Sequence, residues 1–196
     1  MRLSWQRVVA VVLPIVAGVV LSNTVVWRAS YSVFSATATS AGNSFSALSV
    51  NVTNDSTGPI FSIAGVILAQ TDNRCIQISS TTIRATTVKL YTAIGTAPAN
   101  DVSQYVNIKI EKGTGGTYAS CASFVPSTVP FNAALNTLTS GYTNFGNGLG
   151  PWSLTGTGLP ETLSYRITWT FSASAPGTAQ GGSIPSTTFT WEAQTS

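Results

Sequence analysis

The sequence predicts an all-β sandwich in a single domain, preceded by an export signal. Apolar and polar residues alternate with a period of two in several short runs, turn-forming residues separate these runs, and helical periodicity is almost absent. Such alternation gives a strand one buried face and one solvated face. Charged residues make up 8% of the chain and hydrophobic residues 43%, so a disordered chain, which needs the opposite balance, is excluded.

The first 32 residues are interpreted as a signal peptide. Residues 1–7 are short and basic, and residues 8–21 form an apolar run of 14 residues. This length suits the core of a signal peptide and is short for a membrane-spanning helix, which needs about 20 apolar residues. We therefore expect export with cleavage rather than a retained anchor, and membrane contact only through an uncleaved signal segment.

Cleavage is predicted between Ser32 and Val33. This position leaves the small residues Ser32 and Ser30 at −1 and −3, whereas cleavage after Ala29 would place the bulky Trp27 at −3. The expected boundaries are 1–32 for the signal peptide and 33–196 for the secreted domain.

Strands are expected wherever the alternation is clear. In residues 163–171 the apolar Leu163, Tyr165, Ile167, Trp169 and Phe171 alternate with polar residues. The other expected strands are residues 48–52, 60–69, 75–82, 84–92, 106–110 and 188–193.

The segments between these runs are expected to be turns or loops. Gly, Pro and Asn mark turns at residues 54–59, 95–100, 113–116 and 175–182. Residues 139–160, rich in Gly and Asn, form the longest expected irregular segment. Residues 130–138 are the one place where a short helix is expected.

The two cysteines, Cys75 and Cys121, are predicted to form a disulfide. They are the only pair in the chain, and an exported protein with an even cysteine count normally forms its bridges in an oxidising exterior.

The charge of the chain argues against a nucleic-acid partner. The net charge is +3, but Arg2, Arg7 and Arg28 all precede the predicted cleavage site. The remaining six basic residues equal the six acidic residues, so the mature domain is neutral and has no basic face for a phosphate backbone.

Enzymatic chemistry finds little support in this sequence. The chain has no histidine, which removes zincin sites and Ser–His–Asp or Cys–His catalysis. A carboxylate pair drawn from Asp101, Glu111 and Glu161 could in principle serve a glycosidase, but surface carboxylates are the simpler interpretation. No catalytic residue, metal ligand or cofactor is therefore assigned.

The tryptophans offer another candidate site, a sugar-binding platform. Trp169 and Trp191 lie on the apolar side of alternating runs and are expected in the core. Trp152 lies in the glycine-rich segment and is the one that could face a ligand.

Both ends of the predicted mature domain resemble the TasA/camelysin family. Phe34, Ser35, Gly42, Asn43 and Phe45 match the start of that family's mature proteins, whose pattern is A-Y-F-S-D-T-x-T-S-x-G-N-x-F-x-A-G. Residues 188–194, Thr-Phe-Thr-Trp-Glu-Ala-Gln, resemble its last strand. In the middle, residues 73–76 and 88–91 look like the actinobacterial branch.

The resemblance implies a secreted jelly-roll subunit of cell-surface or biofilm-matrix fibres. In such fibres the amino-terminal segment of one subunit adds a strand to its neighbour. The family's acidic residue after Phe-Ser is Ala36 here, so a metal ligand at that position is missing, and Leu48 replaces the glycine that the family has after Ala47.

The candidate donor strand lies within residues 33–45, directly after the predicted cleavage site. Its first seven residues contain no charge, no Pro and no Gly, which suits strand addition. These residues are Val33, Phe34, Ser35, Ala36, Thr37, Ala38 and Thr39.

The sequence leaves two classes of function open. The first is a homopolymeric structural subunit, with cell-wall or matrix components as further partners. The second is a monomeric extracellular binding module that holds a glycan or a protein through loops including residues 139–160.

Overall fold

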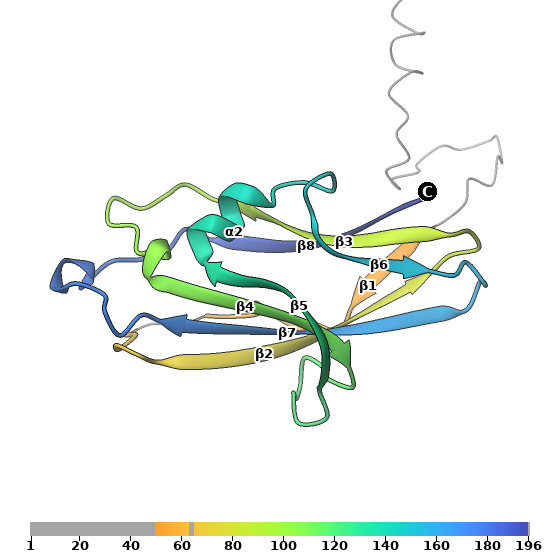
Figure 1. Ribbon diagram of the computed structural model, residues 1–196, viewed down its shortest axis with the longest axis horizontal. Helices are drawn as coiled ribbons and strands as arrows, with labels where there is room; N and C mark the ends of the chain where they lie inside the picture. Colours follow the sequence, from red (N-terminus) through yellow and green to blue (C-terminus); the bar gives the residue numbers. More distant parts are fainter. Residues whose placement is uncertain (1–49, 63–64, 196) are drawn as a thin grey trace, which may run out of the picture. The chain divides into compact units, whose positions relative to one another are not determined.

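The computed structural model describes residues 50–62 and 65–195 (Figure 1). The signal peptide, the cleavage site Ser32/Val33 and the candidate donor strand 33–45 therefore lie outside the described residues. By its internal contacts the chain divides into Met1–Phe45 and Ser46–Ser196, and the fold described here belongs to the second unit.

Two antiparallel sheets face each other in two layers, as the all-β prediction requires (Figure 1). The five-stranded sheet has the order β1-β2-β7-β4-β5, and the three-stranded sheet has the order β6-β3-β8. The strands of the first are β1 (Asn51–Asn54), β2 (Thr71–Thr81), β7 (Pro160–Phe171), β4 (Val106–Thr114) and β5 (Val125–Ala134). Those of the second are β6 (Leu149–Leu154), β3 (Thr86–Ile94) and β8 (Thr187–Thr195). One short helix, α2 (Leu135–Gly141), and two 3₁₀ turns, Ser103–Tyr105 and Gly177–Ala179, complete the described elements.

The core lies between the two sheets, and the period-two pattern fills it. Tyr165, Ile167 and Trp169 of β7 are buried on the inner face, as their alternation predicts. The ring of Tyr165 meets the ring of Trp191 on β8 at a centroid distance of 5.4 Å. Strand β8 therefore lies opposite β7.

Residues 60–69, expected as a strand, do not form one in their described part. Gly65 has φ +67° and Ala69 has φ +62°, and these left-handed conformations interrupt an extended chain. The segment instead ends in a turn in which the Gln70 amide donates to the Ile67 carbonyl at 3.2 Å.

Two strands form in segments for which the sequence predicts other structure. Residues 130–134, expected to begin a helix, belong to strand β5, and the helix starts only at Leu135. Strand β6 lies inside residues 139–160, the segment expected to be irregular. Both are edge strands, where prolines are tolerated and the alternation is weak, so their sequences look like loops.

The sandwich has two ends, which we name after the first and last residues of β7. At the Pro160 end, β2 leads into β3 and the β6–β7 loop closes. At the Phe171 end, β3 and β7 finish and β2, β4 and β8 begin. Strand β1 begins at the Pro160 end, since Asn51 pairs with Thr81, so the chain enters the sandwich at that end.

Candidate functional site: an apolar groove beside an unpaired sheet edge

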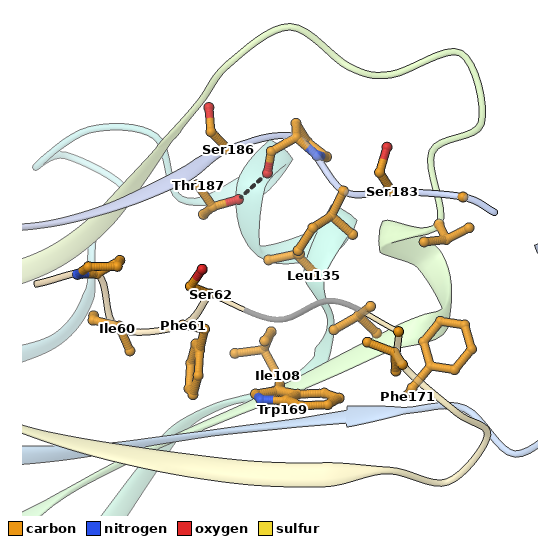
Figure 2. Close-up of a pocket in the computed structure, with 18 of the residues that line it drawn as sticks. Ile60, Phe61, Ser62, Ile108, Leu135, Trp169, Phe171, Ser183, Ser186 and Thr187 are labelled. Carbon is orange, nitrogen blue, oxygen red and sulfur yellow. Dashed lines mark hydrogen bonds between the residues drawn. The ribbon is translucent and has the colours of Figure 1, made fainter.

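An apolar groove of about 1650 Å³ lies between the sheets on the side of β1 and β8. Ile108 and Trp169 of the five-stranded sheet form one wall, and Leu135 of α2 lies across from them toward the start of β8, as Figure 2 shows. The start of β8 and the residues before it form the opposite wall. Phe61 lies between the two walls (Figure 2).

The groove exists because the sheets differ in width. Strand β8 lies opposite β7, and Gly150 of β6 lies against Pro130 of β5, so the two sheets match on the β5–β6 side. The five-stranded sheet continues past β7 with β2 and β1, whereas the described part of the other sheet ends at β8. Within the described residues no strand pairs with the free edge of β8, and residues 60–62 and 65–68 run along the space beside it.

Of the four edge strands in the described part of the chain, β8 has the fewest features that prevent pairing with another strand. Strand β5 contains Pro126 and Pro130 and two register shifts, and β6 contains Pro151 and its own register shift. Strand β1 has only four residues. Strand β8 has nine residues with no Pro, no Gly and a single charge, Glu192. Prolines, bulges, charges and short length are the devices that normally prevent edge-to-edge pairing.

On the opposite side the sandwich is held closed. Lys112 of β4 donates from its ammonium group to the carbonyls of Gly150 (3.2 Å) and Pro151 (2.9 Å) on β6. Partial burial lowers the pKa of Lys112 below its usual range. These bonds tie the two sheets together on the β5–β6 side, opposite the groove.

Exposed aliphatic side chains line the groove at the Phe171 end. Ile67 and Leu68 lie on the turn before β2, and Ile184 lies before β8. The turn is fixed by two backbone bonds to β7: Ala69 donates to the Phe171 carbonyl (3.1 Å), and Phe171 donates to the Gln70 carbonyl (2.9 Å). These bonds hold the aliphatic rim in place.

The loop joining β4 and β5, residues 115–124, folds over the outer face of the five-stranded sheet; we call it the flap. The predicted disulfide is confirmed: Cys121 of the flap is bonded to Cys75 of β2. The Ser164 hydroxyl donates to the Gly116 carbonyl at 2.7 Å, and the Arg166 guanidinium lies over the Phe124 ring. Disulfides persist in oxidising compartments, so this one indicates a non-cytoplasmic environment.

The flap also supports the wall of the groove. The Asp55 carboxylate accepts hydrogen bonds from the Gln77 amide of β2 (2.8 Å) and from the Tyr118 amide of the flap (2.7 Å). The Tyr118 hydroxyl donates to the Pro59 carbonyl at 2.9 Å. Pro59 directly precedes Ile60 and Phe61, so the disulfide-bonded flap positions the segment that enters the groove.

Two buried indole groups at the groove lack a hydrogen-bond partner within the described structure. Trp169 and Trp191 both line the groove, and the Nε1 atom of each is buried and unpaired. A buried donor without an acceptor costs about 1–3 kcal/mol.

The three carboxylates that could have formed a catalytic pair lie apart, and each serves a local contact. Glu111 of β4 pairs with Arg166 of β7 and with Lys109 of its own strand. Asp101 accepts from the Ser103 amide, and Glu161 accepts from the Thr155 amide, both at 2.8 Å. Across residues 50–62 and 65–195, no group of three or more His, Cys, Asp or Glu residues is placed to hold a metal ion.

The tryptophans depart partly from expectation. Trp169 is buried, as predicted, and Trp191 is half-buried at the groove. Trp152, expected in a loop where it could face a ligand, instead lies on β6 opposite Val88 and packs against the core. Within the described residues, no helix has the length and apolar composition needed to cross a membrane.

Sequence reasoning missed the groove. Its one available signal was the composition of residues 187–195, which form a long strand without Pro or Gly. Comparison of the chain with protein-family models and with curated proteins found no match in either case.

Proposed function

We propose that this chain is a secreted structural subunit, resembling TasA, that assembles into cell-surface or biofilm-matrix fibres by β-strand addition. One observation carries the proposal: the edge of β8, which has no strand partner within the described residues and no Pro, Gly or bulge to block pairing, borders an apolar groove of about 1650 Å³. Added strands gain main-chain hydrogen bonds at such an edge, and pockets for alternate side chains give specificity.

The proposed donor is residues 33–39 of a second copy. Seven extended residues span about 23 Å at 3.3 Å per residue, which fits within the nine residues of β8. In the donor, Phe34, Ala36 and Ala38 alternate with polar residues, so one apolar face can enter the groove while the hydroxyl-bearing face stays in solvent.

The direction of the chain favours donation between copies. Strand β8 runs from the Phe171 end to the Pro160 end. The linker follows the donor in the chain, so the carboxyl end of the donor lies where it enters the groove. A donor that enters a neighbour's groove at the Phe171 end therefore runs from the Pro160 end to the Phe171 end, antiparallel to β8. A donor that enters the groove of its own copy does so at the Pro160 end, runs the other way and is parallel to β8. Every pairing between the named strands is antiparallel, and parallel pairing is slightly weaker.

The strand connections support a jelly roll as the finer fold class. The β2–β3 pair of consecutive strands lies beside the β6–β7 pair, with β2 on β7 in one sheet and β3 on β6 in the other. This arrangement of two ribbons wrapped across two sheets is characteristic of jelly rolls. A strand added to β8 would widen the smaller sheet to four strands.

The test compares the secreted chain, residues 33–196, with a variant that lacks residues 33–40, by negative-stain microscopy and sedimentation. We expect filaments from the first and monomers from the second, with similar β-sheet circular dichroism. Ala36→Pro is the matched control of equal length, because a proline in the donor removes a main-chain donor from the ladder.

The groove itself is tested with a peptide of residues 33–39 added to the truncated domain. We expect a change in tryptophan fluorescence, because Trp169 and Trp191 line the groove, and no change with the Ala36→Pro peptide. A secreted chain that stays monomeric at high concentration contradicts the proposal and favours a monomeric binding module. A truncated chain that still polymerises shows that residues 33–40 are not the donor strand.

A further inference from the structure

We propose that successive copies also make an end-to-end contact, in which Ile83 and Leu159 of one copy pack on Ile67, Leu68 and Ile184 of the next. This inference rests on the proposed function and adds a second contact to it; on the accepting copy this contact uses the rim of the groove, and on the donating copy it uses residues outside the groove. The partner is a second copy of this chain.

Exposed aliphatic residues gather at the two ends of the described sandwich. Ile83 is 66% exposed and Leu159 is 68% exposed, and both lie at the Pro160 end. Gly158, the neighbour of Leu159, lies against Ile83: a methyl group in place of its hydrogen would be 3.4 Å from Cγ2 of Ile83. At the Phe171 end, Ile67 is 70% exposed, Leu68 55% and Ile184 44%. Apolar patches of this kind on a soluble domain mark interaction sites.

The turn that presents Ile67 and Leu68 is held in a costly conformation. Ala69 has φ +62°, a left-handed conformation that is unfavourable for residues with a Cβ. Such conformations persist where the surrounding structure enforces them, often at functional positions. Here the two bonds to Phe171 enforce it, and the result is a fixed pair of aliphatic side chains in solvent.

The position at which the chain enters the sandwich makes the two ends complementary. The described domain begins at Val50 and enters the sandwich at the Pro160 end, where Ile83 and Leu159 also lie. The aliphatic rim of the groove lies at the Phe171 end. A donor strand passing from one copy to the next therefore brings the Pro160 end of the first copy to the Phe171 end of the second.

The linker is long enough for this contact. Residues 40–49 separate the proposed donor from the described domain, and ten residues reach about 33 Å when extended. The two ends also carry exposed side chains of opposite charge, Arg84 at the Pro160 end and Asp72 at the Phe171 end. Because the two surfaces differ, the contact is head-to-tail and propagates as a filament.

The test replaces both residues of the Pro160 end, Ile83→Glu with Leu159→Glu, in the chain 33–196. These side chains do not line the groove, so the truncated domain that carries both changes should still bind the peptide of residues 33–39 with unchanged affinity. We expect the concentration needed for filament formation to rise at least tenfold. The matched control is Val125→Glu with Val129→Glu, whose side chains are similarly exposed but lie on the β5 edge of the larger sheet, which neither proposed contact uses; it should assemble like the parent.

The outcomes separate the two proposals. Unchanged assembly of the Ile83/Leu159 variant, or an equal loss in the β5 control, overturns the end-to-end contact. Failure of the peptide to bind the parent domain instead overturns strand addition at the groove. Circular dichroism and thermal unfolding check that each variant is folded.

Discussion

Glu111 is the one charged residue among the buried residues that the structure describes. It accepts a hydrogen bond from Arg166 Nε at 2.8 Å and pairs with Lys109 at 2.9 Å. The hydrogen bond from Arg166 lowers the pKa of Glu111 below its usual range, against the opposing effect of burial. A charged pair of this kind needs both partners, because removing one leaves the other without compensation.

This ion pair predicts a pH dependence of stability. Because the pKa of Glu111 is lowered in the folded state, its contribution is present above the pKa of the unfolded chain, about 4.3, and is lost as the pH falls through the lower folded value. We expect Glu111→Gln to lower the free energy of unfolding by about 2 kcal/mol at neutral pH, the size of a hydrogen bond to a charged group. Below about pH 4.5 the free energy of unfolding should fall less steeply with pH in the variant than in the parent. Urea unfolding between pH 3 and 7 measures both effects. An equally steep acid dependence in the variant would count against this assignment.

At the scale of elements, the flap joins chain segments that the sheets alone would leave apart. Cys121 bonds to β2, Gly116 accepts from Ser164 of β7, and Tyr118 reaches Asp55 and Pro59 beyond β1. The outer face of the larger sheet and the wall of the groove are therefore mechanically connected. A change at the disulfide is expected to reach the groove through Tyr118.

Replacing both cysteines by serine should weaken the domain and loosen this wall. The bridge closes a loop with a sequence separation of 46 residues, for which the loop-entropy treatment gives about 3–4 kcal/mol. We expect that loss in urea unfolding, together with faster hydrogen exchange at the amides of Gln77 and Tyr118, which donate to Asp55. Amides in the centre of β7 serve as the internal control. Unchanged exchange at Tyr118 would show that the flap keeps its place without the disulfide.

At the scale of the whole molecule, the proposed assembly depends on where the secreted chain begins. Cleavage after Ser32 leaves the donor segment intact at the new amino terminus, and the linker 40–49 then joins it to the Pro160 end of the sandwich. In the proposed assembly, donor, linker, groove and aliphatic ends together give a head-to-tail filament with one polarity.

Amino-terminal sequencing of the secreted protein is expected to begin at Val33. The small residues at positions 30 and 32 are the reason, since signal peptidases need small side chains before the cut. A chain that begins at Thr39 would have lost six of the seven proposed donor residues. That result would contradict both the cleavage site and the donor segment.

The sequence by itself determined the fold class, most strands and the disulfide. Strong alternation identified residues 163–171 as a strand of the core, because a period of two with large apolar side chains is satisfied only by a strand with one buried face. The pairing of Cys75 with Cys121 followed from there being one pair in a chain predicted to be exported.

Only the tertiary structure decided which edges are open and what lies between the sheets. Strands β5 and β6 carry prolines and weak alternation because they lie at edges, and an edge is a property of neighbours, not of local sequence. The apolar residues 60–69 look like a strand, yet their described part has no strand partner and turns at Ala69. The groove arises because one sheet is two strands wider than the other, a difference in pairing that no local pattern of residues records.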